Sequence, residues 1–392
     1  MYFSFFLFVP ICISEPVTVS LSKQSIPNYI SRISTTSLTN VSNAIWLCPL
    51  SVGTVDETFW LQVDTGSADT WIRGKSCVNP TNDGSCEGPK LEPTIESGIQ
   101  SLKSSFSNSY GTGKLSADIY ISKLAIGDLS TSIPFGVSTM EEGFSRMDGL
   151  LGLGFSQVSS IAKATGLTAN FFDSLGYTDD ENKFGFYLSN FSSGGELTFG
   201  GVDRTRYSGR FQYFSQVKLQ KLDRNTNSPI IGIVDTGSSL ILLSQGVADA
   251  VNKAIGALWD PQKNFYIIDC KKKNLPNVVF RYNEVEFIIP PSVYVYPIGI
   301  ICISGITNGI SSSKPGLIFG AVFLRQYYSV FDKSTTPPRV GFALANHQKS
   351  GELGNIDSYL KAEQKNGSSE NILSFWTICI AATISIFVYS FT

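Results

Sequence analysis

The sequence has 392 residues, of which 42% are hydrophobic and 16% charged, with 35 glycines, 17 prolines and a formal net charge of −2. That length is enough for two domains with sizeable cores, the composition favours a β-rich, turn-rich globular protein over a disordered one, and the charge offers no basic field to attract nucleic acid. The single histidine, His347, excludes a His-dependent catalytic triad and a His-rich metal site, so catalysis would have to rest on carboxylates, without metal or other cofactor.

The first 43 residues precede the region that carries the motifs. Residues 1–14 are strongly apolar and end at the small residue Ser14, which predicts a signal peptide; the run is too short for a membrane-spanning helix. Residues 15–43 begin with a strand-like alternation at 16–23 and form either a short pro-segment or an N-terminal arm of the mature protein. Asn40 begins a glycosylation sequon.

A short motif follows two predicted strands, 45–54 and 58–63, and then occurs again after the apolar run 230–234. The copies are Asp64-Thr65-Gly66-Ser67 and Asp235-Thr236-Gly237-Ser238, with aspartates 235 − 64 = 171 positions apart. In each copy a strand delivers a carboxylate to a tight turn, where glycine permits close backbone approach and hydroxyls can hydrogen-bond a carboxylate. One copy is weak evidence, because these are ordinary turn residues, but two copies predict one shared site.

Between the copies, several segments have a predictable structure. Residues 79–93 are rich in Pro, Gly and Asn and predict a surface loop, while the alternation over 106–126 predicts a hairpin with Tyr110 near its tip. The alternative for Tyr110 is an ordinary cross-strand aromatic. Residues 159–176 predict a helix, and Asn190 begins a second sequon.

The second half repeats the organisation of the first. Residues 198–210 predict the crossing between the halves, 214–228 are short and polar, and 244–255 predict a helix. The apolar-apolar-Gly segment at 150–152 has a counterpart at 317–320. Both halves therefore share the order strand, motif, apolar-apolar-Gly, which indicates an internal repeat with pseudo-twofold symmetry.

Four of the seven cysteines can form two disulfides. Cys77 and Cys86 flank the polar loop, and Cys270 and Cys302 bracket a hairpin-like region at 275–291. Free, buried thiols are the alternative, which the export signal disfavours. Cys48 has no predicted disulfide partner, and we interpret it as a strand residue packed as a small hydrophobe.

Further segments extend the two motifs into a family pattern. They are Trp71, Tyr110-Gly111-Thr112-Gly113, 148–154, 184–188, 194–201, 323–332 and 340–343. With these residues the chain resembles the pepsin-like aspartic proteases over about 44–346. The resemblance implies a mostly β, bilobal pepsin-like fold with pseudo-twofold symmetry, with lobes at 44–205 and 206–346 and an active-site cleft between them. Both predicted disulfides fit the positions of this family.

The resemblance also implies an aspartic endopeptidase, monomeric, that hydrolyses protein or peptide substrates. Its catalytic pair would be Asp64 and Asp235, which share a proton and activate a water. The residues implied to contact substrate are Gly66, Ser67, Tyr110, Gly111, Thr112, Gly237 and Ser238. Thr65 and Thr236 would cross-brace the two turns.

Two residues of the pattern carry open questions, and the function has an alternative. Trp71 would support Tyr110, unless it is an ordinary core tryptophan. Ala321 departs from the family pattern, because many relatives have Asp immediately after the glycine at position 320. The pH optimum of the family therefore does not carry over to this chain. The alternative function is a catalytically inactive pepsin-fold module that binds peptides or proteins at the cell surface; the presence of both aspartates and of Tyr110 disfavours it.

The C-terminal region predicts a membrane attachment. Residues 347–371 are a polar linker, and 372–392 form a hydrophobic tail. Asn366, or Gly367 or Ser368, is a candidate attachment site for a GPI anchor, because small residues precede the tail. A single spanning helix is the alternative, since the tail is long enough. These features resemble the secreted, fungal-type, GPI-anchored yapsin-like branch and predict a cell-surface or extracellular location.

Overall fold

The computed structural model describes residues 33–41, 45–111, 113–189, 194–215, 217–219, 230–282, 284–298, 300–310 and 316–347. The predicted signal peptide, most of 15–43, Thr112, Asn190, and the linker and tail beyond His347, with Asn366, lie outside these residues. Within the described ranges, no helix is both long enough and apolar enough to cross a membrane.

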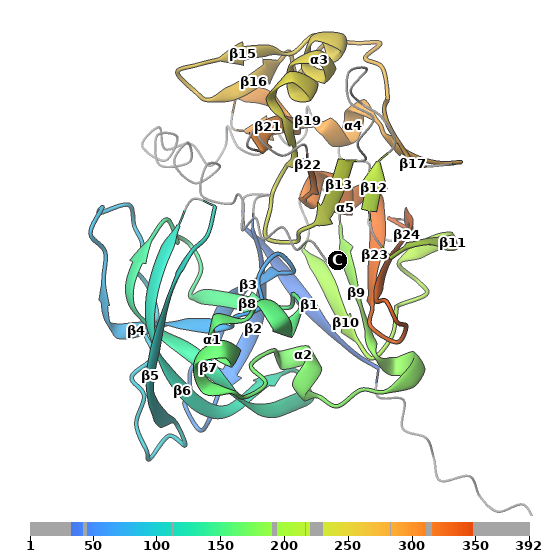
Figure 1. Ribbon diagram of the computed structural model, residues 1–392. Helices are drawn as coiled ribbons and strands as arrows, with labels where there is room; N and C mark the ends of the chain where they lie inside the picture. The colour runs from blue at the N-terminus through green and yellow to red at the C-terminus, as the bar shows by residue number, and fades with distance from the viewer. Residues whose placement is uncertain are drawn as a thin grey trace, which may run out of the picture. The chain divides into compact units, whose positions relative to one another are not determined.

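Strands dominate the first half of the chain (Figure 1). Their burial alternates, as in β6, where Leu115, Ala117 and Ile119 face the core between more exposed neighbours. The strands are β1 (Ser34–Val41), β2 (Ile45–Val52), β3 (Phe59–Asp64), β4 (Trp71–Val78), β5 (Gln100–Ser109), β6 (Lys114–Ile126), β7 (Leu129–Glu142), β8 (Gly149–Gly152), β9 (Lys183–Leu188) and β10 (Gly195–Phe199). The predicted strands at 45–54 and 58–63 and the hairpin at 106–126 are confirmed.

The second half adds shorter strands. These are β11 (Tyr207–Phe214), β12 (Val217–Leu219), β13 (Ile230–Val234), β14 (Ile241–Ser244), β15 (Leu258–Asp260), β16 (Phe265–Ile268), β17 (Val278–Tyr282), β18 (Val285–Ile289), β19 (Val295–Ile298), β20 (Ile301–Ser304), β21 (Ile306–Ile310), β22 (Gly316–Phe319), β23 (Tyr327–Asp332) and β24 (Arg339–Ala345). One 13-stranded sheet contains strands of both halves, in the order β11-β24-β23-β9-β10-β1-β2-β3-β8-β4-β7-β6-β5. Residues 200–206, inside the predicted crossing, connect β10 to β11.

The predicted internal repeat is present in the strand pairing. In the first half β8 lies parallel to β3 and antiparallel to β4, and β4 lies parallel to β7. In the second half β22 lies parallel to β13 and antiparallel to β14, and β14 lies parallel to β21. This arrangement brings each apolar-apolar-Gly segment beside the strand that ends at the motif, so the two motifs occupy equivalent positions.

Among the residues that the structure describes, helices are few and short. They are α1 (Ser160–Thr165), α2 (Phe171–Ser174), α3 (Gln245–Ile255), α4 (Pro291–Tyr294) and α5 (Ala321–Gln326), with 3-10 turns at Ser156–Val158 and Asp179–Glu181. The predicted helix at 244–255 is confirmed as α3, which begins after Ser244. The prediction of one helix over 159–176 was wrong. Gly166, with φ of 70°, ends α1, and the Asn170 side chain caps a separate helix α2 by accepting from the Asp173 N–H.

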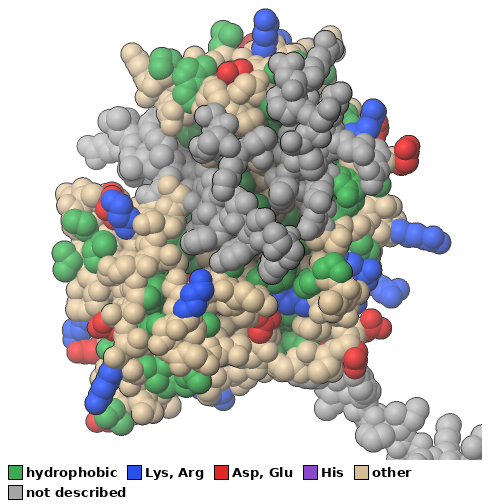
Figure 2. Space-filling model, viewed as in Figure 1, with side chains coloured by type: hydrophobic (Ala, Val, Ile, Leu, Met, Phe, Trp, Pro, Cys, Tyr) green, Lys and Arg blue, Asp and Glu red, His purple; other side chains and the backbone are tan. Residues whose placement is uncertain are grey.

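The cysteines lie as the sequence suggested. Disulfides join Cys77 to Cys86 and Cys270 to Cys302, and the second encloses the β17–β18 hairpin. Cys48 is a free, fully buried thiol in β2, and its burial raises its pKa to about 12, so it stays protonated and inert. On the face shown in Figure 2, Lys and Arg side chains are interspersed with Asp, Glu and apolar side chains.

Candidate active site

The two aspartates of the repeated motif face each other across two turns. Asp64 ends β3 and Asp235 follows β13. Both residues are buried: only 6% of Asp64 and 4% of Asp235 is exposed. A Cβ placed on Gly66 would lie 2.8 Å from Oδ1 of Asp235, and one placed on Gly237 would lie 2.7 Å from Oδ1 of Asp64. Each glycine therefore leaves the space that the carboxylate of the opposite turn fills.

Each carboxylate receives the same pair of hydrogen bonds from its own turn. The Ser67 hydroxyl donates to Oδ2 of Asp64 at 2.5 Å, and the Gly66 N–H donates to Oδ1 at 2.8 Å. Ser238 and Gly237 donate to Asp235 in the same way, at 2.7 and 2.9 Å. These bonds hold both oxygens of each carboxylate, and Oδ1 of each is the oxygen that lies against the glycine of the opposite turn.

The two threonines form the expected cross-brace between the turns. The Thr65 N–H donates to Oγ1 of Thr236 at 3.0 Å, and the Thr236 N–H donates to Oγ1 of Thr65 at 3.1 Å. Each hydroxyl then donates to a carbonyl of the opposite strand, Val234 at 2.9 Å and Val63 at 2.8 Å. Four hydrogen bonds therefore join the halves directly beneath the carboxylates.

Burial and charge make Asp64 a weak acid. The pKa of Asp64 is raised well above its usual value, first by burial and then by the negative charge of Asp235. The hydrogen bonds from Ser67 and Gly66 lower the pKa in part. A carboxyl in this environment keeps a proton at a pH where an exposed aspartate is ionised, so the pair can hold one proton between its two members.

The hairpin tip formed by β5 and β6 carries Tyr110. Backbone hydrogen bonds between Tyr110 and Gly113, of 2.8 and 3.2 Å, close the turn. The Tyr110 ring packs edge-on against Phe144, with centroids 5.4 Å apart, and Phe144 packs in the same way against Trp71 at 5.0 Å. Trp71 is a fully buried core tryptophan, in one apolar cluster with Phe144, and its contact with Tyr110 runs through Phe144. Burial raises the pKa of Tyr110, and the charges of Asp69 and Asp64 raise it further.

Asp69 was not singled out from the sequence, yet it joins three elements at the site. Its carboxylate, with the residue 1% exposed, accepts from the Ser159 hydroxyl at 2.5 Å and from the Ser160 and Ile161 N–H groups at 2.9 and 3.0 Å. The amide of Asn108, in β5, lies 3.4 Å away. Asp69 therefore holds the start of α1 and one strand of the Tyr110 hairpin to the turn that contains Asp64. Its only sequence signal was a carboxylate between small and apolar residues.

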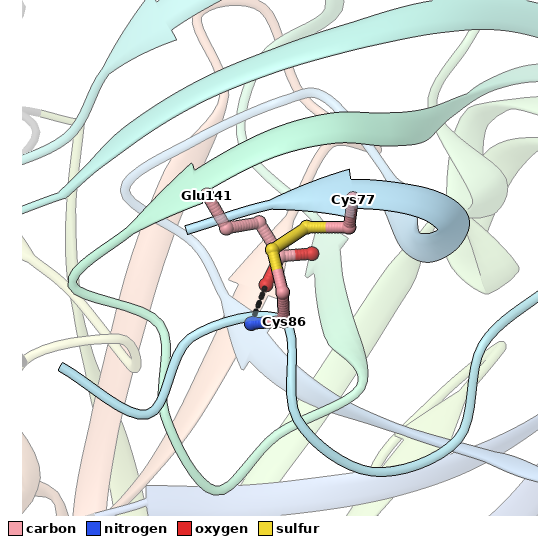
Figure 3. Close-up of side chains that lie close together, drawn as sticks. All are labelled: Cys77, Cys86 and Glu141. Carbon is pink, nitrogen blue, oxygen red and sulfur yellow. Dashed lines mark hydrogen bonds between the residues drawn. A yellow bond between two sulfur atoms is a disulfide. The ribbon is translucent and has the colours of Figure 1, made fainter. Parts of the chain in front are cut away.

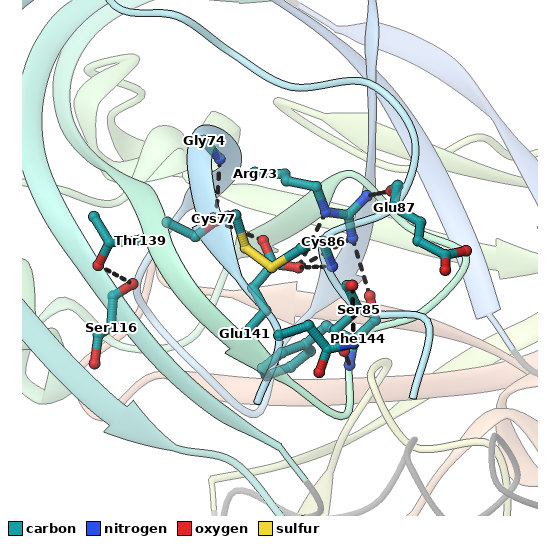
Figure 4. Close-up of a disulfide and its surroundings, with 12 residues drawn as sticks. Arg73, Gly74, Cys77, Ser85, Cys86, Glu87, Ser116, Thr139, Glu141 and Phe144 are labelled. Carbon is teal, nitrogen blue, oxygen red and sulfur yellow. Dashed lines mark hydrogen bonds and ion pairs between the residues drawn. A yellow bond between two sulfur atoms is a disulfide. The ribbon is translucent and has the colours of Figure 1, made fainter. Parts of the chain in front are cut away.

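A buried ion pair of Arg73 and Glu141 lies next to the first disulfide (Figure 4). Arg73 donates to Oε2 of Glu141 at 3.1 Å and to the carbonyl oxygen of Phe144 at 3.0 Å; Arg73 and Glu141 are 1% and 0% exposed. The Cys86 N–H also donates to Glu141, at 3.3 Å. This cluster fixes the backbone of the residue on which Tyr110 packs.

Cys77, Cys86 and Glu141, in the same region, do not form a metal-binding site with thiolate ligands. The side chains of Cys77, Cys86 and Glu141 lie within 4.8 Å of one another. Both sulfur atoms belong to the disulfide, as Figure 3 shows, so neither is a thiolate that could bind a metal ion.

Gln62 is a second residue that sequence reasoning missed. It lies in β3 two positions before Asp64, is 5% exposed, and its side-chain amide donates to the carbonyl oxygen of Gly237 at 2.9 Å. Its signal in the sequence was one polar residue within the apolar run 59–63.

The other predicted positions are less informative. Gly111 is exposed at the hairpin tip, and Asn40 lies in β1 with a partly exposed side chain. Ala321 is fully buried as the first residue of α5, and its N–H donates to the carbonyl oxygen of Ser238 at 2.8 Å.

Comparison with known proteins agrees with this geometry. The profile of the family described as eukaryotic aspartyl protease matches residues 46–345. A probable vacuolar protease A of Arthroderma benhamiae is 32% identical over 323 residues, covering 75% of this chain and 77% of that protein. Human gastricsin is 31% identical over 328 residues, covering 77% and 82%, and bovine pepsin A is 29% identical over 344 residues, covering 83% and 90%.

A solved structure shows the same fold. The crystal structure of an aspartic proteinase from Irpex lacteus superposes with a TM-score of 0.68 over 82% of this chain and 100% of that chain, at 23% identity.

Proposed function

The chain belongs to the eukaryotic aspartyl protease family and is an aspartic endopeptidase, and on this premise we propose that Asp64 and Asp235 are its catalytic residues. The observation that supports the assignment best is the symmetry of their surroundings. Each buried carboxylate is held by a serine hydroxyl and a glycine N–H of its own turn and lies against the glycine of the other turn. An inactive binding module has no support.

The proposed mechanism uses one proton shared by the pair. The ionised member acts as general base on a water held between the carboxylates, and that water attacks the peptide carbonyl. The protonated member donates a hydrogen bond to the carbonyl oxygen and later supplies the proton that the leaving amine needs. The raised pKa of Asp64 supports this arrangement, since a carboxyl of the pair then keeps a proton at a pH where an exposed aspartate is ionised.

The hairpin tip would close over the bound peptide. Tyr110 lies at the tip, with its ring held by Phe144, so the hairpin can cover a substrate and exclude water from the reacting carbonyl. The remaining proposed contacts to an extended peptide come from both turns and the tip: Gly66, Ser67, Gly237, Ser238, Gly111 and Thr112.

The test of the catalytic pair uses two isosteric variants. Asp64→Asn and Asp235→Asn should each abolish peptide hydrolysis, because an amide can neither accept the water proton nor share a proton with its neighbour. Both purified variants should keep the wild-type far-UV circular dichroism and still bind a statine-type transition-state mimic. Substantial turnover by either one would contradict the assignment.

We further propose that the protein enters the secretory route as a monomer, with lobes at 44–205 and 206–346, and is glycosylated at Asn40 and Asn190. The relatives named vacuolar protease A support such a route. The small residues before the apolar tail support a GPI anchor at Asn366, or at Gly367 or Ser368, of the yapsin-like type, with a single spanning helix as the alternative.

Phosphatidylinositol-specific phospholipase C separates these two attachments. The enzyme should release active protein from intact cells if a GPI anchor holds it. Retention in the membrane fraction, together with an epitope placed after Thr392, would instead establish the spanning helix.

A further inference from the structure

Gln62 makes a contact across the two halves that the internal repeat does not explain. Residues two apart on a strand point to the same face, so Gln62 and Asp64 lie on one face of β3. The amide nitrogen of Gln62 reaches the opposite turn and donates to the carbonyl oxygen of Gly237 at 2.9 Å. The adjacent strand residues, Leu61 and Val63, are fully buried and apolar, so an amide at this depth is unusual for the strand.

At the equivalent described position of the second half, no side chain can make this hydrogen bond. The position two before Asp235 is Ile233, an aliphatic residue that packs against the core and has no donor. The contacts of the serines, glycines and threonines around the pair are mirrored between the halves. Gln62 therefore introduces an asymmetry, directed from the Asp64 strand to the Asp235 turn.

The hydrogen bond acts on the peptide group that lies between two supports of Asp235. The carbonyl of Gly237 and the N–H of Ser238 belong to one peptide plane, and that N–H donates to the backbone oxygen of Asp235 at 3.3 Å. The Ser238 hydroxyl donates to Oδ2 of Asp235. Fixing the Gly237 carbonyl therefore fixes the orientation of the groups that hold the Asp235 carboxylate.

We propose that Gln62 is a positioning residue, which holds the Asp235 turn in register with Asp64 through the Gly237 carbonyl. The inference rests on the proposed function of the pair. Gln62 does not take part in proton transfer; it sets the alignment of the two carboxylates, on which sharing of the proton depends.

Two substitutions separate hydrogen bonding from space filling. Gln62→Leu keeps the approximate volume but has no donor. It should lower kcat by about tenfold to a hundredfold, the range for a misplacement of up to about 1 Å, with KM changed by less than about twofold. Gln62→Glu can donate to the Gly237 carbonyl only while its carboxyl is protonated.

The pH profile is the readout that a purely structural role would not move. Gln62→Glu should approach wild-type kcat at the acid end and lose activity as the pH rises, because an ionised carboxylate would face both the Gly237 carbonyl and the charges of Asp64 and Asp235. Its basic limb should therefore lie at least about one pH unit below that of the wild type. Gln62→Leu should be reduced throughout, without such a shift.

Ile233→Leu is the matched control at the equivalent position of the repeat, and it should keep wild-type kcat. Active-site titration with a statine-type inhibitor normalises every rate to folded enzyme. Wild-type kcat in Gln62→Leu, or equal losses in both Gln62 variants without a pH difference, would overturn the inference. If Gln62→Leu does not fold, the pH profile of Gln62→Glu decides alone. Turnover by Asp64→Asn or Asp235→Asn would instead refute the catalytic pair itself.

Discussion

At the scale of single residues, the site contains one carboxyl, that of Asp64, placed where its ionisation is unfavourable. Asp64 is buried beside a second carboxylate, and the donors Ser67 and Gly66 offset only part of that cost. The burial that raises the pKa of Asp64 therefore lowers the stability of the fold where Asp64 is ionised, and this effect has a defined pH dependence.

The sign follows from the raised pKa of Asp64. Between its unfolded pKa, about 3.9, and its higher folded pKa, the folded state binds more protons than the unfolded state, so stability falls as the pH rises. Asp64→Asn cannot ionise and should have a higher melting temperature than wild type at pH 7, with the difference shrinking toward pH 3. Thermal unfolding across this range measures it, and Asp56→Asn, at an exposed position, should show no comparable trend. A difference that grows toward acid pH would contradict the argument.

At the scale of elements, Asp69 connects a turn, a helix and a hairpin. Three donors from Ser159, Ser160 and Ile161 converge on its buried carboxylate. The helix α1 is only six residues long, too short to be stable by its own hydrogen bonds, so its place depends on this anchor.

Asp69→Ala should therefore destabilise the protein by about 3 kcal/mol, because it leaves buried donors without an acceptor. It should also raise KM, since Asn108 in the Tyr110 hairpin loses its contact with the turn. Asp69→Asn keeps one acceptor oxygen and should have the smaller effect on both quantities. Urea unfolding and steady-state kinetics test this, with Asp128→Asn at an exposed position as the control. Equal effects of the Ala and Asn variants would argue against the acceptor role.

Elements also show what the sequence could and could not predict. The strands before Asp64 and Asp235 were predictable, because apolar runs ending in a turn motif are local signals. The single helix over 159–176 was not, because Gly166 and Asn170 divide it by capping interactions whose effect depends on the exact backbone. Asn170 also donates to the Gly152 and Gly154 carbonyls, contacts that only the folded chain brings together.

At the scale of the whole molecule, both halves contribute to one structure. The 13-stranded sheet pairs β9 of the first half with β23 of the second, and the threonine cross-brace joins the halves at the site. The repeat and the pairing of the aspartates were readable in the sequence. Gln62 was not, because its partner, Gly237, is 175 positions away and no local pattern encodes that distance.

The cross-brace should behave as one cooperative unit. Thr65→Val and Thr236→Val each remove a hydroxyl that both accepts and donates across the halves. Each variant should destabilise the protein, and the double variant should lose less than the sum, with a coupling energy of about 0.5–3 kcal/mol. A double-mutant cycle from chemical unfolding measures this. In the control cycle, which combines Thr65→Val with Thr54→Val at an exposed position, the two losses of stability should add. Additive losses for Thr65 and Thr236 would show that the two hydroxyls act independently.

The lack of a side chain at Gly66 and at Gly237 has a consequence for how the sequence of this protein can change in evolution. A side chain added at Gly66 would strike the Asp235 carboxylate, which is encoded 235 − 66 = 169 codons downstream, and one added at Gly237 would strike Asp64. The two halves therefore cannot accumulate substitutions at these positions independently of each other. A substitution of either glycine displaces the aspartate of the other half, so the two copies of the motif can diverge only through paired changes.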